Sequence, residues 1–297
     1  MKLEAGTYVN LEVEKEVEPN GYYLTNGSEN VLLHYSEIEG QIQIGDVLEV
    51  FLFHDTHDRL ASTMKRPLIS LGELALLEVA DVHPRMGCFL EMGLGRQLLL
   101  PIRELPEESE LRPIVGDKVY VELEQDKQGR MLAKLAGEKE FQPYIFHAPT
   151  TWKNQWFDAR VYKTLKMGTF VLVDGGVLGF GVIGMIHSSE RTKSLRVGEI
   201  VQVRVTYVRE DGRVNLSLRP SKEKGRDEDA TKLLNFLKER PNGAMPYSDK
   251  TPADIILHKF NISKAAFKRA MGKLMKEDLI RQDENWTYLK EKQPNNE

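Results

Sequence analysis

Cysteine is almost absent from this chain of 297 residues, because Cys88 is the only one. An intrachain disulfide and a metal site built from several cysteines are therefore excluded, and a reducing compartment is expected. Apolar runs are short, so the sequence predicts no membrane span. The first residues, Met1-Lys2-Leu3-Glu4, lack the apolar stretch of a signal peptide. We therefore expect a cytoplasmic protein with no membrane partner.

Motifs of nucleotide-dependent and hydrolytic enzymes are missing too. The sequence contains no Walker loop, nucleophile elbow or cysteine-based metal motif. Residues 179–184 match the G-x-G-x-x-G string, but residues 185–187 continue as a strand, where a dinucleotide site needs a helix. His54 and His57 have a metal-like spacing without further ligands nearby, and Cys88 is expected to be a packed thiol. The sequence predicts a non-enzymatic protein without metal or cofactor.

Charge is unevenly distributed along the chain, although the net charge is only −4. Residues 1–66 hold 5 Lys/Arg and 12 Asp/Glu, and residues 67–146 hold 9 and 14. Residues 147–225 hold 13 and 7, and residues 226–297 hold 14 and 12. A polyanion is therefore expected to bind the C-terminal half first, unless the difference among domains has no functional cause.

One sequence phrase occurs three times. Each copy starts with Gly-x-(Phe/Tyr)-hydrophobic, continues through an apolar strand to an acidic residue, and ends on a strand led by arginine. The copies start at Gly21, Gly87 and Gly168, and their last strands follow Arg59, Arg130 and Arg213. A period of roughly 70 to 80 residues is too long for a solenoid and is typical of tandem small domains.

Each copy is expected to form five short strands. Residues 157–162 and 201–205 alternate in the period of two that is typical of a strand with one buried face. Five such strands can close into a barrel without exposed edges. We therefore predict three five-stranded OB-fold barrels, over residues 1–66, 67–146 and 147–225.

Turns and connectors separate these elements. Gly129 and Gly212 indicate the hairpin before the last strand, whereas residues 54–59 of the first copy contain no glycine, so that turn is expected to differ. Residues 138–151 carry two prolines and predict a connector between the second and third units. Residues 219–225 predict a second, charged linker.

Beyond that linker the period becomes helical. A stripe of apolar residues in 233–237 predicts one helix, and Thr251 is expected to cap the next. Ser263 is expected to cap a third helix, followed by a two-stranded wing over 279–289. Phe267, Met271 and Leu274 lie on one face of the third helix, opposite Arg269, Gly272 and Lys276. This order predicts a winged helix-turn-helix over residues 226–291.

Residue types that bind nucleic acid recur at matching places in the barrels. An aromatic ring on a sheet can stack on any base, and a guanidinium can reach phosphate. The recurring residues are Tyr23, Phe89 and Phe170, then His34 and His187, then Arg59, Arg130 and Arg213. The alternatives are aromatic rings in the core, structural histidines, and arginines paired with neighbouring carboxylates.

Four spaced blocks of the third copy resemble the RNA-binding domain of the ribosomal protein S-one type, an OB-fold barrel. They are Gly168-x-Phe170-Val171, Gly184-Met185-Ile186-His187, Val197-Gly198-Glu199 and Gly212-Arg213-Val214-x-Leu216-Ser217-Leu218. The resemblance implies RNA contacts for Phe170, His187 and Arg213, for Phe89, Asp126 and Arg130, and for Tyr23, His34, Asp55 and Arg59. The sequence departs from that pattern at Asn20, Met86 and Met167 in place of an aromatic, at Pro101 in place of the histidine, and at Arg209 in place of an acid.

The whole arrangement resembles the bacterial conserved virulence factor B family, which has three such barrels followed by a winged helix. The resemblance covers essentially the full chain. It implies an RNA-binding post-transcriptional regulator of virulence genes in Gram-positive bacteria.

These features predict a protein that binds single-stranded RNA, such as messenger RNA, through one basic surface on the third barrel and the winged helix. Phe170 is expected to stack on a base. The residues expected on phosphates are Arg213, Arg209, Lys163 and Lys166.

Three rival functions follow from other features. A DNA-binding regulator would place Arg269, Lys273 and Lys276 of the third helix in a duplex groove. An interaction scaffold would dock the two acidic barrels on a basic partner, such as a ribosomal protein. A nuclease is disfavoured because no metal cluster is visible in the sequence.

Overall fold

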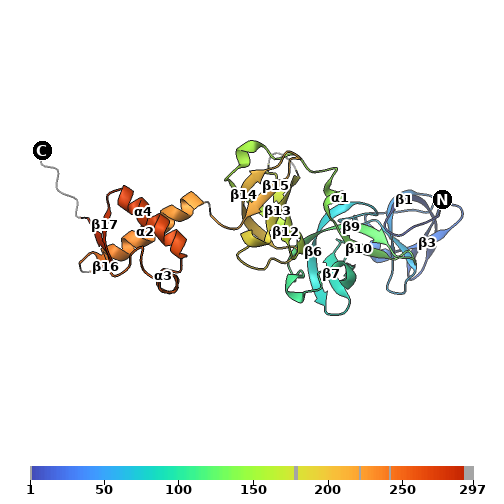
Figure 1. Ribbon diagram of the computed structural model, residues 1–297. Helices are drawn as coiled ribbons and strands as arrows, with labels where there is room; N and C mark the ends of the chain where they lie inside the picture. Colours follow the sequence, from blue (N-terminus) through green and yellow to red (C-terminus); the bar gives the residue numbers. More distant parts are fainter. Residues whose placement is uncertain (1, 177–179, 221, 241, 291–297) are drawn as a thin grey trace. The chain divides into compact units, whose positions relative to one another are not determined.

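The computed structural model describes residues 2–176, 180–220, 222–240 and 242–290. The chain forms two compact units, Met1–Arg219 and Pro220–Glu297 (Figure 1). The first unit contains three five-stranded sheets that are closed or nearly closed, and the second contains helices and a small sheet. The predicted fold class, three OB-type barrels followed by a winged helix, is confirmed.

The first barrel closes in the strand order β1-β2-β3-β5-β4. Its strands are β1 (Tyr8–Val17), β2 (Gly21–Thr25), β3 (Asn30–His34), β4 (Val47–His54) and β5 (Leu60–Thr63), with the short helix η1 (Tyr35–Glu37) after β3. The β3–β5 pair is parallel, as OB-fold closure requires. Alternate strand residues fill the interior, among them Leu11, Val13, Leu24, Leu33, Val50 and Leu52.

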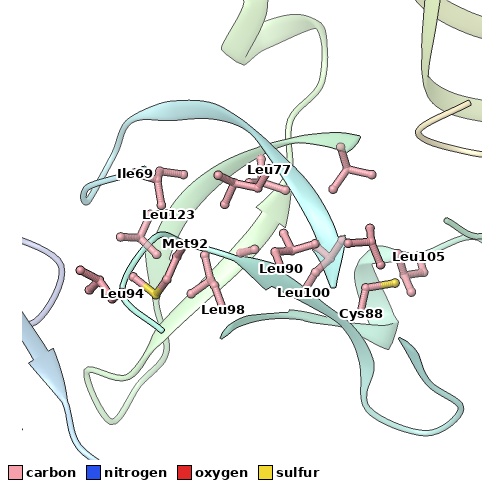
Figure 2. Close-up of a cluster of buried hydrophobic side chains, with 14 of the residues drawn as sticks. Ile69, Leu77, Cys88, Leu90, Met92, Leu94, Leu98, Leu100, Leu105 and Leu123 are labelled. Atoms are coloured by element: carbon pink, nitrogen blue, oxygen red, sulfur yellow. The ribbon is translucent and has the colours of Figure 1, made fainter. Parts of the chain in front are cut away.

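The second barrel has the same strand sequence but is only nearly closed. It consists of β6 (Leu74–His83), β7 (Gly87–Glu91), β8 (Gln97–Pro101), β9 (Lys118–Gln125) and β10 (Met131–Leu135), with the short helices η2 (Ile102–Glu104) and η3 (Ser109–Leu111). Strands β8 and β10 end the sheet. Figure 2 shows its leucine-rich core, in which Cys88 is fully buried. Burial raises the pKa of the Cys88 thiol to about 11, so the predicted packed thiol is confirmed.

The third barrel closes in the order β11-β12-β13-β15-β14. Its strands are β11 (Trp156–Leu165), β12 (Gly168–Asp174), β13 (Gly181–His187), β14 (Ile200–Val208) and β15 (Val214–Ser217), with η4 (Thr150–Trp152) before β11 and η6 (Ser188–Glu190) after β13. Strand β13 runs without interruption through Gly184. The G-x-G-x-x-G string is therefore a strand from Gly181 onward, and Gly179 lies outside the described residues.

The glycine that starts each sequence copy is required by a close approach of two strands. A Cβ atom on Gly21 would lie 2.1 Å from the Leu33 carbonyl oxygen, and one on Gly87 would lie 2.0 Å from that of Leu100. Each glycine pairs across the sheet with the residue at the histidine position, which is His34 for Gly21 and Pro101 for Gly87. The recurrence of this glycine is therefore steric.

The turn before the last strand is the same in all three barrels, contrary to the expectation for the first. Asp58 has φ 56°, close to the values of 79° for Gly129 and 80° for Gly212. The backbone N–H of each of these residues donates to the carbonyl oxygen three positions earlier. Aspartate is one of the few residues with a side chain that tolerate this left-handed region. The expectation of a different turn is wrong because it relied on glycine alone.

The C-terminal unit consists of α2 (Lys222–Lys238), β16 (Ala244–Met245), α3 (Ala253–Phe260), α4 (Lys264–Lys276), β17 (Ile280–Asp283) and β18 (Trp286–Leu289). The buried face of α4 contains Phe267, Met271 and Leu274, as predicted. Ser263 caps α4, since its hydroxyl accepts a hydrogen bond from the Ala266 N–H at 3.2 Å. The wing strands β17 and β18 are present, with β16 as a third strand.

Two local predictions in this unit are wrong. Thr251 does not cap α3, because its hydroxyl accepts a hydrogen bond from the Ser248 N–H and Pro252 occupies the cap position. The predicted linker over residues 219–225 is helical from Lys222 onward. Its charged composition concealed the first turn of α2.

Candidate nucleic-acid interface

One row of side chains crosses the outer surface of the third barrel. Cross-strand pairing sets Lys163 of β11 beside Phe170 of β12, and Phe170 beside Met185 of β13. Met185 pairs with Asn215 of β15, which pairs with Tyr207 of β14. Directly opposite residues share one face of a sheet. We call these five residues the outer row.

The outer row is accessible, while the residues that alternate with it are not. Tyr207 is 53% exposed and Lys163 is exposed. Phe170 is half-buried, with its ring centroid 6.4 Å from that of Tyr162. The alternating residues belong to the barrel core and include Val171, Ile186 and Leu216. The row therefore presents two aromatic rings, one thioether, one amide and one cation on a single face.

The two recurring histidines have a structural contact and one nitrogen left for a ligand. His187 precedes η6, and its Nδ1 accepts a hydrogen bond from the Ser189 N–H at 3.2 Å. His34 accepts the same bond from Ser36 before η1. Because a backbone N–H can only donate, Nδ1 must be unprotonated in the neutral ring and Nε2 must carry the proton. Both exposed rings can thus donate to a ligand through Nε2.

All three recurring arginines are paired with carboxylates. Arg59 donates two hydrogen bonds to the same oxygen of Asp55, Oδ2, through Nε at 2.9 Å and through Nη2 at 2.7 Å. Partial burial raises the pKa of Asp55, but hydrogen bonds from Arg59 and from the His57 N–H lower it to about 2. Arg130 pairs with Asp126 in the same way. Arg59 and Arg130 thus form the pairs with neighbouring carboxylates that were the alternative to RNA binding, and these pairs stabilise the turn. Contact of these two arginines with RNA stays a prediction.

Arg213 differs from the other two because its partner comes from outside its turn. It donates through Nη1 to Glu138 at 3.1 Å and through Nη2 to the second oxygen of the same carboxylate. Arg209 stands where the other barrels have the acid, and it pairs with Asp211 at 2.9 Å. Lys163 and Lys166 are exposed, and neither forms an ion pair with a residue that the structure describes.

Part of the same face of the third barrel is covered by the connector between the second and third barrels. The connector contains α1 (Glu138–Phe141), whose Phe141 is fully buried with its ring 4.9 Å from that of Tyr162. Burial, together with the Glu138 charge, raises the pKa of Tyr162, while Arg213 lowers it. The covered barrel residues next to Phe141 include Leu172 and Ile183. The open part of the face is therefore the outer row and its surroundings.

The equivalent rows of the first two barrels are altered. In the first, Lys15 lies 5.7 Å from the Tyr23 ring, but the row ends at Ala61 and Phe53, which pack against the core of the second barrel. In the second, Phe89 is half-buried and pairs with Asp81, so that an acid stands where the third barrel has Lys163. Among the three barrels, the third is the one whose exposed row combines a cation with two aromatic rings.

The winged-helix unit presents cations on α4. Arg269 and Lys276 are exposed, as predicted for the outward face. Lys273 is half-buried, and its Nζ lies 2.7 Å from the Asp227 carboxylate and 3.6 Å from that of Glu277. These pairs lower the charge that Lys273 offers to a ligand. The predicted joint surface with the third barrel remains a prediction.

Sequence reasoning missed Met185, Asn215 and Tyr207 in the outer row, and Glu138 beside it. Tyr207 follows the alternating stretch of β14, and its outward direction depends on a bulge between Val205 and Tyr207. A bulge reverses the alternation, so no strict period of two finds this tyrosine. Glu138 is 75 positions from Arg213 in sequence, and only packing brings them together.

No group of three or more His, Cys, Asp or Glu side chains in the described part of the chain is placed to hold a metal ion. Within the same residues, no helix has the length and apolar character needed to cross a bilayer.

Sequence comparisons define the class of protein. Residues 5–65 match the S1 domain family, residues 74–134 match the CvfB first S1-like domain, and residues 141–220 match the second domain of virulence regulatory factor CvfB. Residues 231–289 match the CvfB-like winged helix domain. The chain is thus a protein of S1-type barrels and a winged helix, which are nucleic-acid-binding domain types and not catalytic families.

Comparisons over the full length define the family. Conserved virulence factor B of Staphylococcus saprophyticus is 33% identical over 281 residues, covering 94% of this chain and 87% of the relative. Uncharacterized protein YitL of Bacillus subtilis is 41% identical over 288 residues, covering 97% and 94%. The chain belongs to the conserved virulence factor B family.

A solved structure has the same architecture. It is a crystal structure from Streptococcus pneumoniae, described as a multidomain protein with nucleic acid binding domains. It is 31% identical, has a TM-score of 0.61, and the match covers 96% of this chain and 98% of the other.

Proposed function

We propose that this protein binds single-stranded RNA through the outer row of the third barrel. The observation that carries the proposal is the row itself, in which Lys163, Phe170 and Tyr207 share one accessible face across neighbouring strands. Two rings on a strand surface can stack successive bases of an unpaired chain, at about 1–3 kcal/mol per base. Lys163 and Lys166 supply the phosphate contacts that any such chain requires.

The surroundings of the row favour an unpaired chain over a duplex. Bases that stack on Phe170 and Tyr207 must be splayed from a partner strand, which costs pairing energy in a duplex. His187 adds a hydrogen-bond donor at Nε2 near the same end of the face, since it pairs with Gly168 two positions from Phe170. The charge of residues 147–225, with 13 Lys/Arg against 7 Asp/Glu, supports the approach of a polyanion.

The family supports a regulatory role. Relatives from three Staphylococcus species carry the name conserved virulence factor B. We infer that this protein regulates gene expression after transcription by binding messenger RNA, with virulence factors among the regulated products. Crosslinking in cells followed by sequencing of the bound RNA tests this, and recovery of no messenger RNA above background would contradict it.

The RNA site is tested by binding of an unstructured RNA of about 16 nucleotides to the full chain. Tyr207→Ala removes an exposed ring, and Phe170→Leu removes the second ring while keeping an apolar side chain against Tyr162. Each is expected to raise Kd roughly 5- to 150-fold, which corresponds to the loss of one stacked base. Tyr144→Ala is the matched control, because this tyrosine is 52% exposed but outside the row.

Two results would refute the site. One is that the wild-type chain binds no RNA. The other is that both row variants bind as tightly as the Tyr144→Ala control.

A second candidate function is binding of duplex DNA through α4, favoured by the exposed Arg269 and Lys276. Competition of labelled single-stranded RNA against duplex DNA separates the two. If DNA competes better than RNA and Arg269→Gln abolishes that competition, the DNA function is supported in place of the RNA function.

A further inference from the structure

Arg213 is the recurring arginine that lacks an acid four positions before it. In the first two barrels, Asp55 and Asp126 hold the arginine four positions later. The third barrel has Arg209 at that place, so its turn cannot neutralise Arg213 in the same way. The nearest carboxylate within the turn is that of Asp211, 3.6 Å from the Arg213 Nε.

Glu138 takes the place of the missing acid from 75 positions away. Its two carboxylate oxygens accept from the two terminal nitrogens of Arg213, which is the two-pronged geometry that a phosphate also adopts on a guanidinium. The pair lies beside the outer row, because Arg213 precedes Val214 and Asn215 on β15. Glu138 thus occupies an anion site at the edge of the open face.

The contact can open without unfolding the connector. The side chains of Arg213 and Glu138 are 36% and 41% exposed, so water and salt screen their attraction. Phe141, on the same short helix, is fully buried among Tyr120, Tyr162 and Phe180. The helix is therefore held by an aromatic anchor, while its acidic end makes only a screened contact.

We propose that Glu138 is an internal competitor of RNA phosphate for Arg213, a role that rests on the RNA-binding function proposed above. In the free protein the carboxylate neutralises Arg213 and weakens attraction for anions. When RNA lies along the outer row, a phosphate takes the guanidinium and Glu138 turns to solvent.

Glu138→Gln in the full chain tests the competition. The amide keeps the size and a hydrogen-bonding oxygen but removes the charge, and RNA affinity is expected to rise about two- to fivefold. Glu140→Gln is the matched control, since it removes the same charge from the same helix and its carboxylate binds the Gly137 N–H, not Arg213. The third variant is Arg213→Gln, alone and combined with Glu138→Gln.

The proposal predicts that Glu138→Gln binds RNA more tightly than Glu140→Gln, and that this gain vanishes when Arg213 is also replaced. An equal gain in the two glutamate variants would overturn it, since the effect would then be net charge alone. A gain that persists without Arg213 would overturn it as well. Loss of binding in Tyr207→Ala together with an unaffected Glu138→Gln would reject the competitor while leaving the RNA site intact.

Discussion

Replacing Lys163 by glutamine isolates a single phosphate contact of the outer row. Lys163 is exposed, forms no ion pair with the residues described, and lies directly beside Phe170. Its removal should therefore leave folding unchanged and reduce the number of neutralised phosphates by one. On a single strand each such contact contributes about 0.7 to the slope of log K against log salt.

The magnitude follows from that slope. Raising salt from about 50 to 200 mM is a fourfold change, so one contact is worth about 2.6-fold in affinity over this range. The ratio of the Kd of Lys163→Gln to that of the wild-type chain should shrink by this factor as salt rises. With Lys166→Gln added, the ratio should shrink by about sevenfold.

The assay is a titration of fluorescent RNA followed by anisotropy at four or more salt concentrations. Lys15→Gln is the matched control, because Lys15 holds the equivalent place in the first barrel beside Tyr23. It should leave the slope unchanged if the third barrel dominates binding. A Lys163→Gln variant that loses affinity by the same factor at every salt concentration would refute a direct phosphate contact.

Three further outcomes concern stability. Burial raises the pKa of Cys88 from 9.0 to about 11, so the stability that the neutral thiol contributes is complete below pH 9 and is lost as pH rises to 11. In Cys88→Ala, the free energy of unfolding measured with denaturant should therefore depend less on pH across this window. Gly212→Ala should lower the thermal midpoint more than Gly129→Ala, since a Cβ on Gly212 would lie 2.3 Å from the His147 ring while Gly129, with nearly the same φ, has open space; equal shifts would contradict this. Ser263→Ala should cost the C-terminal unit about 1 kcal/mol by calorimetry, and no change would mean that its cap bond is not formed in solution.

The barrels could be recognised from sequence because their determinants are local. The alternation of apolar residues in strands such as β14 and the paired glycine of each copy depend on neighbours within one sheet. The outward position of Phe170 could not be assigned in this way, since residues 170–173 are all apolar and a place in the core stayed open as the alternative. The winged helix followed from the Ser263 cap and the apolar face of α4.

Two local predictions failed because a residue plays a different role from the one that its type suggested. Asp58 adopts the left-handed conformation that was expected of glycine, so the first turn matches the others. Thr251 accepts a bond from Ser248 instead of capping α3. At the first place aspartate meets the same backbone requirement as glycine, and at the second the Thr251 hydroxyl is taken by the preceding turn.

The sequence by itself determined three small barrels, a winged helix, and a third barrel richer in cations than the first two, because strand period, turn residues and charge are written locally. Tertiary structure alone decided which part of the third barrel stays open and what holds its arginine. The connector buries Leu172 and Ile183 beneath Phe141, and it carries Glu138 to Arg213 across 75 positions of sequence. Such contacts depend on how distant segments pack, which no periodicity within either segment encodes.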